Sequence, residues 1–130
     1  MNIERKNPAP KEYQSLRVLT GMTSRTLEAS KKALTHSLFA VCIRDDESNL
    51  IGMGRVVGDI GSHVLVVDIA VHPDHQRKGH SHLIMTEIMN FIKNEVSECA
   101  SVNLFADVDF LYQKYGFIVP TTSTGMILKR

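Results

Sequence analysis

A polar turn between an apolar segment and an amphipathic segment holds the residues with the clearest chemical potential. Residues 64–71 predict a buried strand, residues 76–81 form the turn, and residues 82–96 predict a helix. A helix N-terminus presents unpaired backbone N–H groups and a partial positive charge, which suit a diphosphate. Gly79 lets a ligand approach the backbone, and two basic residues precede it. On residue types alone, a solvated loop with a turn glycine is an equal alternative, because this phosphate signal is weak.

Hydrophobic patterning predicts the elements that position this turn. Apolar residues at helical spacing predict helices over 10–20 and 26–34, with Thr23 or Ser24 as the cap of the second. Apolar runs predict strands over 38–43, 50–57 and 64–71, of which the last is the most apolar and is expected to be central. The remaining prediction is a strand over 101–105, a short helix over 107–115 and a closing strand pair at 117–119 and 126–128. This alternation indicates a mixed α/β sheet.

Length and composition favour one ordinary globular domain spanning residues 1–130. The chain is 43% hydrophobic and 22% charged. Its 15 Lys and Arg against 14 Asp and Glu give a net charge of +1, so no global field attracts nucleic acid or an acidic membrane. Cys42 and Cys99 lie in largely apolar patterns without metal-ligand spacing, and we expect free buried thiols in a reducing compartment.

The first ten residues and the hydropathy of the chain predict the cellular location of the protein. The first ten residues lack the apolar stretch of a secretory signal, and no apolar run approaches the roughly 20 residues of a membrane span. We therefore expect a cytoplasmic protein.

The turn resembles the signature of the GNAT superfamily of N-acetyltransferases, Gln/Arg-x-x-Gly-x-Gly/Ala. Gln76, Gly79 and Ser81 occupy the signature positions, and residues 68–73 look like the strand that precedes it. The third position departs from the pattern, since serine replaces the usual glycine or alanine. Serine is small enough to leave the backbone open.

A second stretch, residues 110–117, is similar to the Tyr-x-x-x-Gly-Phe segment on the last helix of that superfamily. With further likenesses around 38–41, 52–56 and 104–107, the resemblance covers about residues 16–128. It implies a mixed, mostly antiparallel central sheet with helices on both faces and a V-shaped splay between the middle strands.

The resemblance also implies acetyl-CoA as cosubstrate, without a metal. In this family the strand backbone pairs with the pantetheine arm and the turn holds the diphosphate. The implied cofactor-binding residues are Ile69, Ala70, Val71, Gln76, Arg77, Lys78, Gly79, His80 and Ser81. Tyr112 matches the family's general acid, which protonates the departing thiolate.

Asp68 is an acid inside an otherwise apolar strand, so it needs a cation, N–H donors or the substrate cleft. It is a candidate base for the amine, and a structural carboxylate paired with an arginine such as Arg55 is equally favoured. Four histidines surround the turn, but a phosphate site explains the segment better than a metal. Arg17, Arg25 and Glu28 lie where the family's acceptor site is walled.

The predicted function is acetyl transfer to a primary amine by direct attack in a ternary complex. The alternatives are a domain that binds acyl-CoA as a sensor or scaffold without turnover and, more remotely, a nucleotide-phosphate binder. The acceptor is a small-molecule or peptide amine that the sequence does not name, and neither nucleic acid nor a membrane is an expected partner. The oligomeric state stays open, with a homodimer as the commonest assembly.

Overall fold

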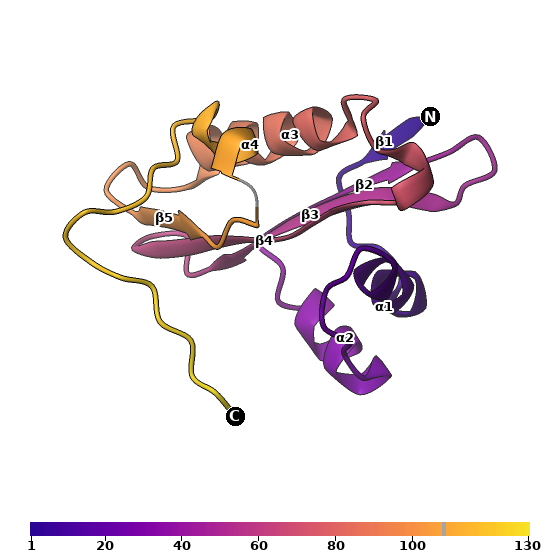
Figure 1. Cartoon of the computed structure of the whole chain (residues 1–130), viewed down its shortest axis with the longest axis horizontal. Coiled ribbons are helices and arrows are strands. Elements are labelled where there is room, and N and C mark those ends of the chain that lie inside the picture. Colours follow the sequence, from indigo (N-terminus) through magenta and orange to yellow (C-terminus); the bar gives the residue numbers. More distant parts are fainter. Residues whose placement is uncertain (108) are drawn as a thin grey trace.

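A five-stranded sheet in the order β1-β2-β3-β4-β5 forms the middle layer in the computed structural model (Figure 1). The structure describes residues 1–107 and 109–130, with the side chains of all of these except 109 and 110. Along the chain the elements are β1 (Asn2–Glu4), α1 (Pro10–Leu19), α2 (Leu27–Leu34), β2 (Phe39–Arg44), β3 (Leu50–Gly58), β4 (His63–Val71), a 3-10 helix (Pro73–His75), α3 (His80–Glu95), β5 (Ser101–Leu104) and α4 (Asp109–Gln113). Strands β1 to β4 pair antiparallel, and β5 pairs parallel with β4. The predicted mixed, mostly antiparallel sheet is confirmed.

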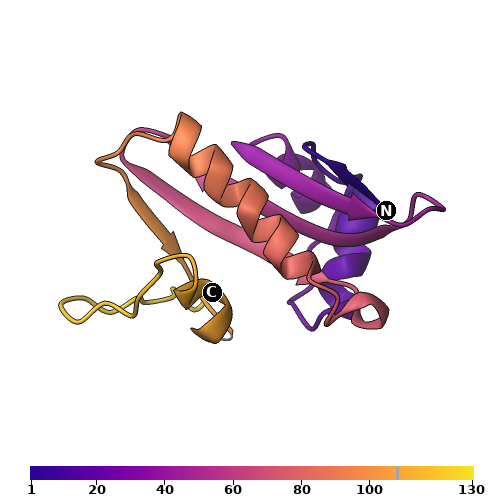
Figure 2. The same cartoon turned by 90° about the horizontal axis from the view of Figure 1, so that it is seen from above.

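Helices cover both faces of this sheet, as predicted. Figure 1 shows α3 and α4 over one face and α1 and α2 under the other, and Figure 2 shows α3 from above, lying over the strands. Alternation along each strand divides the core in the same way, because successive side chains point to opposite faces. Val41 and Ile43 of β2 pack with Ile84 and Ile88 of α3, whereas Cys42 packs with α1.

Several local predictions need correction. Residues Asn2–Glu4 form a strand, which the polar N-terminal sequence did not predict. Pairing with β2 and an ion pair from Glu4 to Arg44 stabilise this strand. Thr26, rather than Thr23 or Ser24, caps α2 by accepting a hydrogen bond from the Ala29 amide at 3.0 Å. Val108, within the helix predicted over 107–115, lies outside the described residues.

The two cysteines differ in environment. Cys42 is buried, and its burial raises the pKa of the thiol to about 12. Cys99 is exposed, so the prediction of a buried thiol is wrong there. It follows the end of α3 in a connection rather than within the core.

The predicted closing strands at 117–119 and 126–128 are not formed. The chain after α4 runs as an extended arm outside β5 and below the sheet (Figure 1). Its apolar side chains are among the most exposed of the protein, with Ile118 at 84%, Met126 at 88% and Leu128 at 80%. A strand needs a neighbouring strand for its hydrogen bonds, and within the described residues no strand pairs with the arm.

The predicted splay lies between β4 and β5. Their parallel pairing runs from His63 with Ser101 to Val66 with Leu104 and then stops. Strand β4 continues to Val71, so residues 67–71 pair with β3 on one side and with no described strand on the other. This open edge leads directly to the turn before α3.

None of the described helices has the length and apolar character that crossing a membrane requires.

Candidate active site

The start of α3 is open to solvent and has no side-chain cap among the described residues. Gly79 is the N-cap residue and adopts a left-handed conformation, with φ 82° and ψ 9°. The first intrahelical donor is Leu83, whose N–H bonds the Gly79 carbonyl at 3.1 Å, so the amides of residues 80–82 lie ahead of it. A Cβ added to Gly79 would meet no heavy atom within 4 Å. The helix therefore presents free donors at its positive end with space in front of them.

Basic residues lead into this helix end, and its first turn has no acidic residue. Arg77 and Lys78 are exposed, and Arg77 has a positive φ of 63°. Gln76 ties the turn to the strand, because its side-chain amide donates to the Val71 carbonyl at 3.2 Å. Of the predicted residues 76–81, all except the buried His80 are at least partly accessible to solvent at the end of the open edge of β4. This accessible turn fits an anionic group.

His80 begins α3 from a buried position. Burial, followed by the nearby charges of His75 and Lys78, lowers its pKa and favours the neutral imidazole. Its Nδ1 atom is buried without a hydrogen-bond partner. Across the described residues, no three His, Cys, Asp or Glu side chains gather in a geometry for a metal ion.

A β-bulge interrupts β4 where the edge opens. Met53 pairs with Ala70 and Arg55 with Val67, so Asp68 and Ile69 both stand opposite Gly54. Asp68, the first bulged residue, has a positive φ of 59°, the left-handed conformation that one type of bulge adopts at this position. Gly54 is needed because a Cβ there would lie 2.8 Å from Ile69 Cδ1 and 2.6 Å from Ile84 Cγ2. The bulge turns Ile69 toward α3 and breaks the regular hydrogen-bond ladder beside the cleft.

The same bulge turns the Asp68 side chain toward α1. One carboxylate oxygen accepts from Tyr13 Oη at 2.7 Å and from Arg55 Nη1 at 2.7 Å, and the other accepts from Arg17 Nη1. All three charged side chains are at most 7% exposed. Ala33 and Ser37 accept further bonds from Arg55. The ion pair with Arg55 that a structural carboxylate requires is therefore present.

Tyr13 joins this cluster through its ring as well as its hydroxyl. Both guanidinium carbons lie over the ring, at 5.8 Å for Arg17 and 5.6 Å for Arg55. Burial, and then the bond to Asp68, raise the pKa of Tyr13, so the phenol remains a donor. Tyr13 was not predicted as part of the site, because its position at helical spacing also fits a core residue.

A pocket of about 490 Å³ lies beside the cluster, between β4 and the two N-terminal helices. Its charged lining comprises Arg17, Arg25, Arg55 and Asp68. Of the three residues expected to wall the acceptor site, Arg17 and Arg25 line this pocket, whereas Glu28 is not among the described residues that line it. The pocket adjoins the bulge from the face opposite α3.

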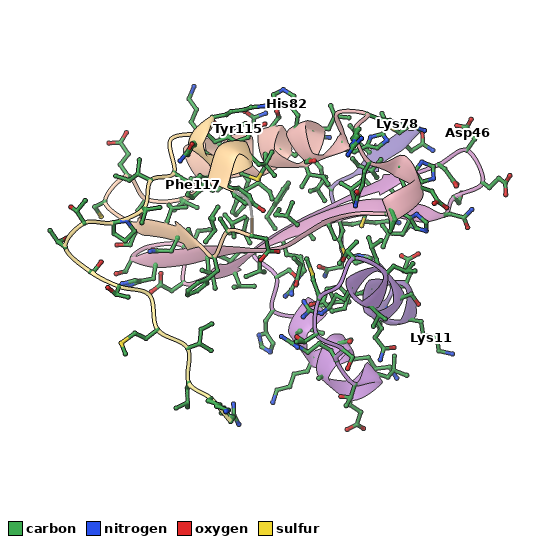
Figure 3. All side chains as sticks on the ribbon, in the orientation of Figure 1. Lys11, Asp46, Lys78, His82, Tyr115 and Phe117 are labelled. Carbon is green, nitrogen blue, oxygen red and sulfur yellow. The ribbon has the colours of Figure 1, made fainter. Side chains whose placement is uncertain are left out.

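Tyr112 lies on α4 and is half-buried against the core that α3 shares with the sheet. Burial, and then the charge of Asp107, raise its pKa, so the phenol is protonated at neutral pH. Its ring meets Phe117 edge-on at 6.4 Å. The neighbouring Tyr115 bonds His82 of α3, and Figure 3 shows these two side chains together above the sheet. The structure thus fixes α4 against α3, and it records no contact between Tyr112 and Asp68.

Comparison with known proteins identifies the architecture. A profile of the acetyltransferase (GNAT) domain matches residues 35–119. The chain is 30% identical over 112 residues to the uncharacterised N-acetyltransferase ycf52 of Porphyra purpurea, covering 82% of this chain but only 63% of that relative. The chain therefore spans less than two thirds of the length of this curated relative.

Solved structures of acetyltransferases superpose on this chain. A probable acetyltransferase of unknown function from meticillin-resistant Staphylococcus aureus superposes with a TM-score of 0.91 at 42% identity, over 99% of this chain and 98% of that one. The GNAT-family protein YhbS of Escherichia coli, solved in complex with CoA, superposes with a TM-score of 0.68 at 18% identity, over 90% of this chain and 68% of that one. This chain belongs to the GNAT family of acetyltransferases.

Proposed function

We propose that this protein transfers an acetyl group from acetyl-CoA to a primary amine by direct attack in a ternary complex. The observation that carries the proposal is the uncapped start of α3 at the end of the open edge of β4. Free amides at a helix terminus suit a diphosphate, and a free strand edge suits the amide-containing pantetheine arm. YhbS, which shares the fold, is a CoA complex.

The residues present fit this cosubstrate. The backbone of Ile69, Ala70 and Val71 would pair with the arm, and the backbone of residues 76–81 would hold the diphosphate. Space in front of Gly79 permits that approach, and Arg77 and Lys78 supply positive charge beside it. When bound, the thioester supplies an activated acetyl group.

The chain's own groups would assist the exchange of a C–S bond for a C–N bond. Tyr112 is the proposed general acid, because its raised pKa keeps a proton available for the departing sulfur. The bulge at Asp68 leaves main-chain groups of β4 outside the regular ladder, where they are free to hold the thioester carbonyl in position. The amine must arrive neutral and lose a proton as the C–N bond forms.

Asp68 remains the predicted acceptor of that proton, directly or through water. Its contacts favour the structural alternative, since two guanidinium groups and a phenol already occupy both carboxylate oxygens. Kinetics of a variant that keeps the side-chain shape can separate the two roles.

The acceptor side of the site carries a positive charge. Three arginines and one carboxylate form the charged lining of the pocket among the described residues, namely Arg17, Arg25, Arg55 and Asp68. Arg25 is exposed and bonds only neutral oxygens of Thr23 and Ser24 in the described part of the chain. We propose that the acceptor amine also bears an anionic group, such as a carboxylate, that meets Arg25.

A screen of amines against acetyl-CoA, with release of free thiol as the readout, tests the function. Matched pairs such as an amino acid and its amide test the anionic group, and we expect the acid to have at least a tenfold higher kcat/KM. Arg25→Gln should remove that preference. CoA binding without thiol release for any amine would favour a sensor or scaffold instead.

A further inference from the structure

The pocket beside the Asp68 cluster brings together several side chains that can carry or exchange a proton. The titratable residues that line it, within the described part of the chain, are Tyr13, Arg17, Arg25, His36, Arg55 and Asp68. The three guanidinium groups are donors only, because arginine keeps its charge in proteins. Burial, and then the bond to Asp68, raise the pKa of Tyr13, so its phenol also keeps its proton. Two groups remain that could accept a proton from a bound amine, namely Asp68 and His36.

Asp68 is poorly placed to accept that proton. Its carboxylate receives hydrogen bonds from Tyr13, Arg17 and Arg55, and both guanidinium groups are almost fully buried. Protonation would remove the charge that these two buried cations need, which is costly. The Asp68 cluster therefore stabilises one wall of the pocket instead of supplying a base.

His36 lies in the turn between α2 and β2, and its side chain is exposed. Its backbone amide donates to the Ala33 carbonyl at 3.0 Å, whereas its imidazole bonds no other group in the described part of the chain. A neutral imidazole keeps one ring nitrogen as an acceptor. His36 thus brings an unused lone pair to the pocket that Asp68 also lines.

Arg55 fixes the turn that carries His36. Its Nε donates to Ser37 Oγ and its Nη2 donates to the Ala33 carbonyl, both at 2.9 Å, on the two sides of His36 in the sequence. Its Nη1 donates to Asp68 at 2.7 Å. One buried guanidinium group therefore ties the turn with His36 to the bulge of β4, where the thioester is proposed to lie.

We propose that His36 accepts the proton that the acceptor amine loses, directly or through one water molecule. This inference rests on the proposed acetyl transfer and names a base for it. The lone pair of the amine nitrogen forms a bond with the thioester carbonyl carbon, and the C–S bond breaks with its electron pair passing to sulfur. Sulfur takes a proton from Tyr112, and the nitrogen gives its extra proton to the His36 imidazole. Exchange with water then restores both side chains.

The charges around His36 suit this transfer. Three arginines and one carboxylate line the pocket, and Lys32 precedes His36 by four residues along the chain. Positive neighbours disfavour an ammonium group, so this lining favours the neutral amine that attack requires. The exposed position of His36 gives water access to remove the proton between turnovers.

The pH dependence of kcat tests this role, with acetyl-CoA and the fastest amine of the screen both saturating. Because imidazoles gain charge roughly between pH 8 and 5, the wild-type kcat should fall towards acidic pH. His36→Gln should lower kcat about 100-fold and abolish this acidic decline, while the KM for the amine and the affinity for CoA stay nearly unchanged. His63→Gln is the matched control. That histidine is exposed at the start of β4 and is not among the described residues lining the pocket, so its loss should leave kcat and its pH profile unaltered.

Added imidazole separates a base from a structural side chain. In His36→Ala, whose Tm should match that of the wild type, imidazole in solution should raise kcat roughly tenfold in proportion to its unprotonated fraction. Absence of this rescue, an unchanged kcat in His36→Gln, or a raised KM at unchanged kcat would overturn His36 as the base and leave acetyl transfer intact. A wild-type protein that releases no thiol with any amine would instead overturn both proposals.

Discussion

Two polar regions flank the bulge of β4, and they differ in how completely the protein satisfies them. On one face, Asp68 is bonded to Tyr13, Arg17 and Arg55, and the arginines also donate to backbone carbonyls. At the other region, the start of α3, the first amides meet neither a side-chain cap nor an acidic residue in the first turn. Within the described residues the first region is fully bonded, while the second has donors without acceptors.

This difference indicates which region needs a ligand. Buried polar groups that are fully bonded stabilise one arrangement, and removing a partner is costly. Open donors at a helix terminus are inexpensive in water and become useful when an anion arrives. The comparison therefore predicts that variants in the Asp68 cluster change stability first, and that variants at Gly79 change binding first.

The largest effect is expected from Asp68→Asn. It keeps the side-chain shape but leaves two buried guanidinium groups without a counter-ion, which should lower the free energy of unfolding by about 3–5 kcal/mol. Denaturant unfolding measures this change. Asp46→Asn is the matched control, because that carboxylate is 94% exposed and its ion pair should contribute less than about 1 kcal/mol.

The same variant decides the role of Asp68. If the carboxylate is only structural, kcat per folded molecule should be nearly unchanged at low temperature. A loss of turnover with unaltered stability would instead make Asp68 a base and would break the comparison between the two regions.

Gly79→Glu should have the next largest effect, on binding. Its carboxylate would stand at the positive end of α3, and we expect CoA affinity to fall roughly 1,000-fold by calorimetry. Gly79→Ala is the control, because both variants carry the strain of a side chain at φ 82°, about 1–2 kcal/mol. Equal affinities of the two variants for CoA would exclude an anion site at this terminus.

Tyr112→Phe should lower kcat by about 100-fold and leave CoA affinity nearly unchanged. Since burial raises the pKa of Tyr112 above its ordinary value of 10.0, loss of its proton should not limit the wild-type rate near neutral pH. The wild-type rate should fall at high pH, where the pH passes the raised pKa and the phenol loses its proton. Tyr115→Phe removes a hydroxyl near the same helix and should have a much smaller effect. Equal losses in both variants would contradict the assignment of Tyr112 as the acid.

Local patterns were sufficient to predict most elements of the fold. Strands β2, β3 and β4 alternate or run apolar over their lengths, and α3 shows clear helical spacing, so burial alone specifies them. Strand β1 was missed because its three residues carry no pattern and depend on pairing with β2, about 40 residues away. The closing strands were predicted from residue types that do favour strands, but no described strand pairs with them.

The site, like the fold, was predictable where its residues are neighbours in the sequence. The glycine at the start of α3 and the basic residues before it are local features, and the structure has them together. The partners of Asp68 were only partly predictable, because Tyr13 and Arg17 lie 55 and 51 residues away along the chain. Arg55, which pairs across the sheet with Val67 directly before the bulge, was the one partner that sequence reasoning had named.

The smallest effect is expected at the start of α2, which has the side-chain cap that α3 lacks. Thr26→Ala removes the bond from the Ala29 amide and should cost about 1 kcal/mol, which lowers Tm by a few degrees. CoA affinity should not change, because α2 lies under the face of the sheet opposite α3 (Figure 1). Ser24→Ala serves as the control, since its side chain makes no described hydrogen bond and should leave Tm within about one degree. A drop in CoA affinity with Thr26→Ala would mean that the two helix termini do not act independently, and the contrast between a self-capped terminus and an open one would lose its meaning.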